Sequence, residues 1–93
     1  MESIIGVGEY RKQDYQEILR LSDDRENMDE TWEAWKANKN KGLKNFHQMG
    51  LKTIDIMVYP RELVKYCREK GLRINGESRA NFISFKVMEM DQG

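Results

Sequence analysis

The sequence contains few residues of the types that build catalytic or metal sites. It has one cysteine, one histidine and one proline in 93 residues. A single cysteine, Cys67, excludes a disulfide within the chain and any cysteine-based zinc cluster. His47 has no second histidine or cysteine at metal-ligand spacing. We therefore expect no metal and no cofactor. We interpret Cys67 as a buried thiol, because it shares a predicted helix face with Leu63 and Val64.

The sequence also lacks long apolar runs, repeats and tracts rich in proline, glycine or serine. No apolar run approaches the roughly 20 residues of a membrane-spanning helix. The first residues carry an acid where a signal peptide needs bases. We expect one domain over residues 1–93 in the cytoplasm, with residues 1–8 flexible or forming a short pairing strand. Gly6-Val7-Gly8 lacks the last glycine of a dinucleotide-binding fingerprint, and we interpret it as a flexible entry segment.

Neither sign of charge predominates, since 16 basic residues balance 16 acidic ones. The two signs are nevertheless separated along the chain. Residues 1–34 hold four bases and ten acids, residues 35–80 hold eleven bases and four acids, and the remainder has a net charge of −1. Such halves can attract each other within one monomer, dock between monomers, or leave the basic half available to a polyanion.

Apolar residues at helical spacing predict helices in the first half of the chain. Residues 9–22 fit one amphipathic helix. Asn27 begins a sequence typical of a capping box and predicts a helix start there. We expect helical pieces over about 28–38 and 40–49, separate or continuous, because Lys39 interrupts their shared apolar stripe. That stripe consists of Met28, Trp32, Trp35, Leu43, Phe46 and Met49.

Start and stop signals follow one another closely in the second half of the chain. Gly50 ends the helical stripe, and residues 52–58 alternate like a half-buried strand. Pro60 predicts the first turn of another helix, which Gly71 ends. Asn75 is a good N-cap for the last element.

The last element, around residues 79–88, fits either a helix or a strand. As a helix it places Ile83 and Val87 on one side and Phe82 and Phe85 on another, so both sides need cover. As a strand it would place Ile83, Phe85 and Val87 on one face. We favour the helix, because the preceding Asn-Gly-Glu-Ser is a good helix start and one strand offers little sheet to join.

The fold class that follows is a small α+β domain, mainly helical, with one short strand at about 52–58 between helices. A lone strand cannot satisfy its own backbone hydrogen-bonding groups. It must therefore pair with the N-terminal segment 3–7, with the C-terminal segment, or with the same strand of a second subunit.

Two sets of residues are candidates for an interaction. The apolar set, for a second subunit or a protein partner, is Phe82, Phe85 and Met88. The alternative set, for nucleic acid, is Arg79, Asn81, Lys36 and Lys39, since the helices within 61–89 resemble a helix-turn-helix in outline. Their connection is longer than the usual three to four residues. Trp32 and Trp35 also stand beside lysines, but we interpret them as core residues.

Four motifs follow one another between residues 10 and 86. They are Trp32-Glu-Ala-Trp35, a short strand after Gly50, Tyr66-Cys67, and Arg79-Ala-Asn-Phe82. In this combination the chain resembles a group of small bacterial proteins of unknown function. The resemblance implies a single helical domain and no particular activity.

No set of residues forms a catalytic constellation, so we expect no enzymatic activity. Our hypothesis is a small cytoplasmic interaction module, without a cofactor, that homodimerises or binds a protein partner. The alternative is a nucleic-acid-binding accessory factor that uses the basic half of the chain. Salt dependence would distinguish the two, because phosphate contacts weaken steeply with ionic strength.

Overall fold

A computed structural model describes residues 4–91 of the chain, as two strands and four helices joined by short connections. In chain order the elements are β1 (Ile4–Glu9), α1 (Lys12–Leu21), a 3₁₀ turn (Arg25–Asn27), α2 (Trp32–Gln48), β2 (Lys52–Met57), α3 (Pro60–Lys70) and α4 (Gly76–Asp91). The predicted class, a small and mainly helical α+β domain, is confirmed. Residues 1–3 and 92–93 of the predicted single domain lie outside the described residues.

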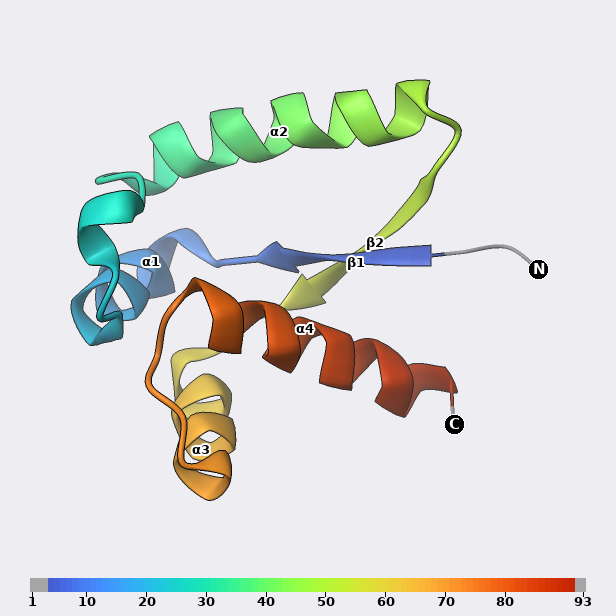
Figure 1. Ribbon diagram of the computed structural model, residues 1–93. Helices are drawn as coiled ribbons and strands as arrows, with labels where there is room; N and C mark the ends of the chain where they lie inside the picture. The colour runs from blue at the N-terminus through green and yellow to red at the C-terminus, as the bar shows by residue number, and fades with distance from the viewer. Residues whose placement is uncertain (1–3, 92–93) are drawn as a thin grey trace.

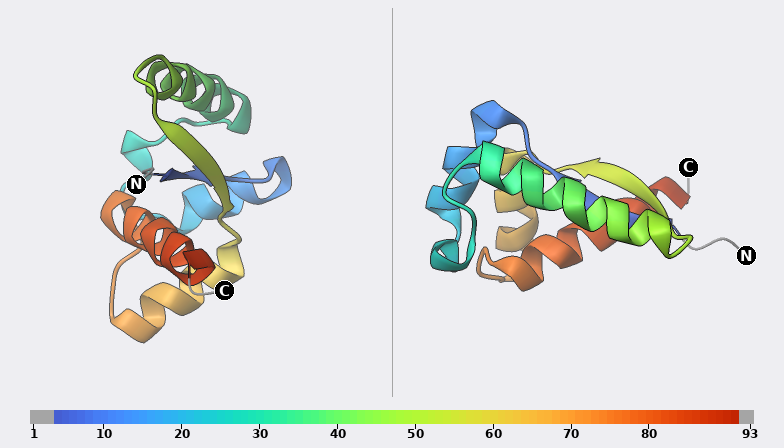
Figure 2. Two further views of the ribbon diagram at one scale, coloured as in Figure 1. Left: turned by 90° about the vertical axis from the view of Figure 1, so that its right-hand side faces the viewer. Right: turned by 90° about the horizontal axis from the view of Figure 1, so that it is seen from above.

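The two strands form a parallel sheet between two helical layers. β1 and β2 pair in register from Ile4 opposite Lys52 to Glu9 opposite Met57. α2 runs over one face of this sheet, and α4 packs on the other with α3 beyond it (Figures 1 and 2). Of the three pairing partners considered for the strand at 52–58, the N-terminal segment is therefore correct. Its expected first residue, Ser3, lies outside the described residues.

The interpretation of Gly6-Val7-Gly8 as a flexible entry segment is wrong, because these residues lie in β1. Their glycines allow α4 to approach the strand closely. A Cβ atom added at Gly6 would lie 2.6 Å from Cγ2 of Val87, and one at Gly8 would lie 2.9 Å from Cδ1 of Ile83. The strand thus has glycines where helix packing leaves no room for a side chain.

α2 is one continuous helix, and its N-terminus differs from the prediction. The N-cap is Thr31, whose Oγ1 accepts a hydrogen bond from the Ala34 amide at 3.1 Å. Asn27 instead ends a short 3₁₀ turn, so the predicted capping box is wrong. The helix ends where predicted, since Gly50 adopts a left-handed φ of 81° that favours glycine.

The signals around α3 and α4 act as predicted. Pro60 opens α3, and Gly71 ends it with a φ of 68°. Asn75 caps α4 through a reciprocal pair of hydrogen bonds with Ser78, at 2.9 and 3.0 Å. The ambiguous segment 79–88 is helical. As the helical alternative required, Ile83 and Val87 meet the sheet while Phe82 meets α3.

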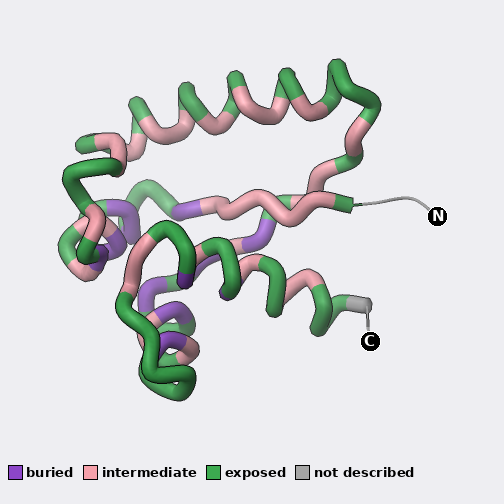
Figure 3. Tube along the Cα trace, viewed as in Figure 1, coloured by how far each residue is buried: buried purple, intermediate pink, exposed green. Residues whose placement is uncertain are grey.

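The core lies at one end of the molecule, where α1, α3, the start of α4 and the ends of both strands meet (Figure 3). Trp32 and Trp35 pack against this core, as predicted. Trp35 stacks on Tyr15 with ring centroids 5.9 Å apart, and Trp32 Nε1 donates a hydrogen bond to the Tyr10 carbonyl at 2.8 Å. The fully buried cluster comprises Tyr10, Tyr15, Ile18, Val58, Leu63, Cys67 and Phe82.

Candidate functional site

The opposite end of the molecule has no comparable core. No residue in 4–8, 36–55 or 83–90 is buried. These residues form the start of β1, the second half of α2 with the start of β2, and the second half of α4. They lie together on the right-hand side of Figures 1 and 3. We call them the open half.

The open half displays large apolar side chains. Four of them are more than half exposed, namely Ile4 at 52%, Met49 at 71%, Met88 at 61% and Met90 at 55%. Phe85, from the same half, is 40% exposed. Single exposed apolar residues are ordinary, but several around one coreless end of a small domain suit a contact with another molecule.

The predicted apolar set needs one correction. Phe82 is 2% exposed and packs edge-on against Tyr66 of α3, with ring centroids 5.4 Å apart. It is a core residue and not part of a docking surface. Phe85 lies 5.5 Å from the same Tyr66 ring but is 40% exposed, and Met88 is 61% exposed. The available surface therefore begins at Phe85 and continues to Met88.

Arg79, the leading candidate for a nucleic-acid contact, is held inside the monomer. Its Nη2 lies 3.0 Å from Oδ2 of Asp24, and its Nη1 donates to Ser22 Oγ at 2.9 Å. The side chain is 11% exposed. Hydrogen bonding from Arg79 lowers the pKa of Asp24, which also accepts the Gly76 amide at the start of α4. Asn81 is exposed on the same helix, α4. The other candidate on this helix, Arg79, already forms an ion pair with Asp24.

The two candidate lysines are also paired within the monomer. Lys36 contacts Glu9 of β1 at 2.9 Å, and Lys39 contacts both Glu9 and Asp55 of β2. The Lys39 side chain is only 4% exposed, so it is an internal link between α2 and the two strands. A signal for this role is present in the sequence, because a lysine interrupts an apolar stripe. Its partners could not be identified, since they lie 30 and 16 residues away.

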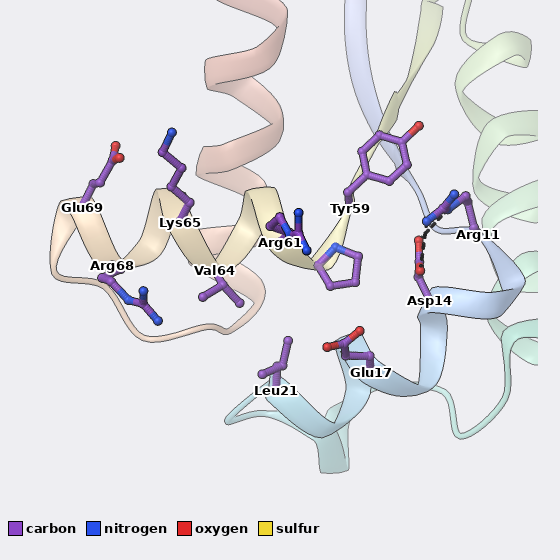
Figure 4. A pocket seen from close by; sticks show the side chains of 11 residues that line it. Arg11, Asp14, Glu17, Leu21, Tyr59, Arg61, Val64, Lys65, Arg68 and Glu69 are labelled. Atoms are coloured by element: carbon purple, nitrogen blue, oxygen red, sulfur yellow. Dashed lines mark hydrogen bonds and ion pairs between the residues drawn. The ribbon is translucent and has the colours of Figure 1, made fainter.

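A groove lies between α1 and α3. It has a volume of about 850 Å³. Figure 4 shows Leu21 and Glu17 of α1 facing Val64 of α3 across it. At one end Arg11 Nε lies 2.6 Å from Asp14 Oδ2, and the Arg11 guanidinium lies 4.9 Å from the centre of the Tyr59 ring. The groove contains both signs of charge: Arg11, Asp14, Glu17, Arg61, Lys65, Arg68 and Glu69.

The residues that could carry chemistry are separated or engaged. Cys67 is buried at 2% exposure, and His47 on α2 lies 3.1 Å from the Thr53 hydroxyl. Tyr15 donates a hydrogen bond to the Asp29 carbonyl at 2.6 Å, and burial raises its pKa to about 12. No three histidine, cysteine or acidic side chains within residues 4–90 are placed to hold a metal ion. Cys67, His47 and Tyr15 therefore each contact other parts of the same chain and do not form one cluster.

Comparison of the chain with models of protein families, with curated proteins and with solved structures gave no match. No helix within residues 4–91 is long and apolar enough to span a membrane. Function has to be argued from the chain's own surfaces.

Proposed function

We propose that the chain is a small, non-enzymatic interaction module that forms a homodimer through its open half. One observation carries this proposal: no residue in 4–8, 36–55 and 83–90 is buried as a whole, and no apolar side chain among them belongs to the buried core. A domain of this length buries only a small apolar core, so burying further apolar surface against a partner adds appreciably to its stability. Each large apolar side chain that a partner covers contributes about 1.5 to 3 kcal/mol.

A second copy is a suitable partner on grounds of charge and symmetry. The chain has a formal net charge of zero, so two copies approach without net repulsion. The prominent side chains of the open half, Ile4, Met88 and Met90, are apolar and neutral. A two-fold contact places the same patch on both sides, and apolar patches are self-complementary.

The alternative, nucleic-acid binding, has less support. Arg79, Lys36 and Lys39 each form an ion pair with an acidic residue of the same chain. Arg61, Lys65 and Arg68 of α3 line a groove whose other wall carries Asp14 and Glu17. Carboxylates beside these cations offset part of the attraction that a phosphate backbone would feel.

Sedimentation equilibrium of two matched variants tests the proposal. Met88→Glu places a charge in the open half, and Leu72→Glu makes the same type of change at a 40% exposed residue outside it. We expect Met88→Glu to weaken dimerisation by about tenfold or more, because a carboxylate loses solvation in an apolar contact. Leu72→Glu should leave the dimer constant unchanged. Equal effects of the two variants, or none from Met88→Glu, would contradict a contact through the open half.

A further inference from the structure

The hydrogen bonds of the sheet define which backbone groups of β1 are unpaired. In the register of the sheet, Glu9 lies opposite Met57. The Val58 amide, one residue after Met57, donates a hydrogen bond to the Glu9 carbonyl at 2.9 Å. In a parallel ladder, every second residue of a strand bonds to the residues flanking its partner. The backbone groups of Ile5, Val7 and Glu9 therefore face β2. Those of Gly6 and Gly8 face the outer edge of the sheet.

That outer edge has no partner strand within the described residues, because the sheet consists of β1 and β2 alone. None of the hydrogen bonds between elements of residues 4–91 uses the amide of Gly6 or Gly8. Proteins usually protect such an edge with lysine, proline or a bulge. β1 reads Ile-Ile-Gly-Val-Gly-Glu and has neither lysine nor proline, whereas β2 carries Lys52 and Asp55. The edge of β1 is the less protected of the two.

The exposed flank of α4 borders this edge. Around the helix surface, Lys86 and Met90 lie towards β2, where they line a cavity with Ile56. Ile83 and Val87 come next and meet Gly6 of β1. Continuing in the same direction, the helix presents Ala80, Ser84 and Met88, all of which are exposed. Two small side chains and one flexible apolar side chain thus follow, around the helix, the residues that contact β1, on the side away from β2.

We infer that the outer edge of β1 pairs antiparallel with the same edge of a second copy, which gives a four-stranded sheet in the order β2-β1-β1-β2. This inference rests on the proposed homodimer and specifies its contact. Antiparallel pairing of a strand with its own copy is inherently two-fold, so the contact closes at two subunits. The occupant of the edge is therefore a second copy of this chain.

The outward-facing residues restrict the register. Outward backbone groups of β1 occur at Ile4, Gly6 and Gly8, and hydrogen-bonded pairs form between such residues. With the two-fold axis at Gly6, Gly6 lies opposite itself and Ile4 lies opposite Gly8 of the second copy. The alternating pairs then match Ile5 with Val7, so that apolar side chains adjoin. Glu9, which holds the two lysines of α2, stays outside the contact.

Amide hydrogen exchange of the wild-type protein, measured by NMR, tests this pairing. The mass of the protein is measured under the same conditions to show whether it is a dimer. We expect the amides of Gly6 and Gly8 to exchange about tenfold or more slowly when the protein is dimeric than when dilution makes it monomeric. The amides of Asp55 and Met57, which face the outer edge of β2, serve as internal references and should stay fast. In Met88→Glu at the same concentration, the two glycine amides should exchange as quickly as those references.

The possible outcomes separate the two proposals. A dimer in which Gly6 and Gly8 exchange as fast as Asp55 and Met57 would refute edge pairing and leave the homodimer intact. A protein that stays monomeric at every concentration would refute both. Slow glycine amides in a monomer would also refute edge pairing, since a segment of the same chain would then cover the edge.

Discussion

Individual side chains stabilise the end of the molecule that contains the buried core, and Trp35 is the clearest case. Its ring centroid lies 4.9 Å from that of Tyr10 and 5.9 Å from that of Tyr15. We expect Trp35→Ala to lower the free energy of unfolding by about 2 to 4 kcal/mol, as aromatic truncation in a core does. Phe46→Ala, on the part of α2 in the open half, should cost less. Urea denaturation compares the two, and equal losses would contradict a core confined to one end.

The Arg79–Asp24 pair predicts a pH dependence of stability. Because the pKa of Asp24 is lowered in the folded state, its contribution is present above its ordinary value of 3.8 and is lost as the pH falls through the lower folded value. We expect Arg79→Ala to reduce the free energy of unfolding by about 1.5 to 3 kcal/mol at neutral pH, and by less below pH 3.8.

Urea titrations of wild type and Arg79→Ala at several pH values measure this difference. Arg73→Ala is the control, since Arg73 is 84% exposed and lies 3.7 Å from Asp23. It should change stability by less than about 1 kcal/mol. A loss for Arg79→Ala that is the same at all pH values would show that the ion pair contributes nothing.

At the scale of elements, the packing of α4 on β1 depends on Gly6. A methyl group there would lie 2.6 Å from Cγ2 of Val87, whose branched side chain has little freedom to move. We expect Gly6→Ala to destabilise the protein by about 1 to 3 kcal/mol. Gly42→Ala is the matched control, because a Cβ at this helical position meets nothing within 4 Å. It should raise stability by about 0.5 to 1 kcal/mol. Thermal melts of the two variants in the same direction would contradict this packing.

Lys39 joins α2 to both strands through ion pairs, and replacing it should weaken the packing of α2 on the sheet. We expect Lys39→Ala to cost about 1 to 3 kcal/mol, less than a fully orphaned buried charge would, because Glu9 keeps Lys36 as a partner. Lys41→Ala, at an exposed position of the same helix, should cost less than about 0.5 kcal/mol. Chemical denaturation of both variants checks this, and equal costs would contradict a link through Lys39.

Element boundaries were predictable from sequence where the signal is local. Pro60, Gly71 and Asn75 each act through their own backbone geometry, so their effect can be read without the rest of the fold. Gly6 and Gly8 were misinterpreted because their role depends on α4, more than 70 residues away. Phe82 was expected at the surface for the same reason, since Tyr66 of α3 packs against it inside the monomer. The partner of Arg79, Asp24, likewise lies 55 residues away in the sequence.

At the scale of the whole molecule, the main feature is the contrast between its two ends. One end buries a cluster of aromatic and aliphatic side chains, and the other presents half-buried apolar residues around a two-stranded sheet. A two-stranded sheet is marginal by itself, and more strands stabilise it. In the proposed homodimer, a second copy would supply both additional strands and a cover for Met88.

The mass of the wild-type protein in solution tests this account most directly. Light scattering over micromolar concentrations should give twice the chain mass of 11.1 kDa. The dimer should persist when salt is raised from about 0.1 to 1 M, because apolar and backbone contacts are screened far less than exposed charges. A mass of 11.1 kDa at every concentration and salt level would contradict the account.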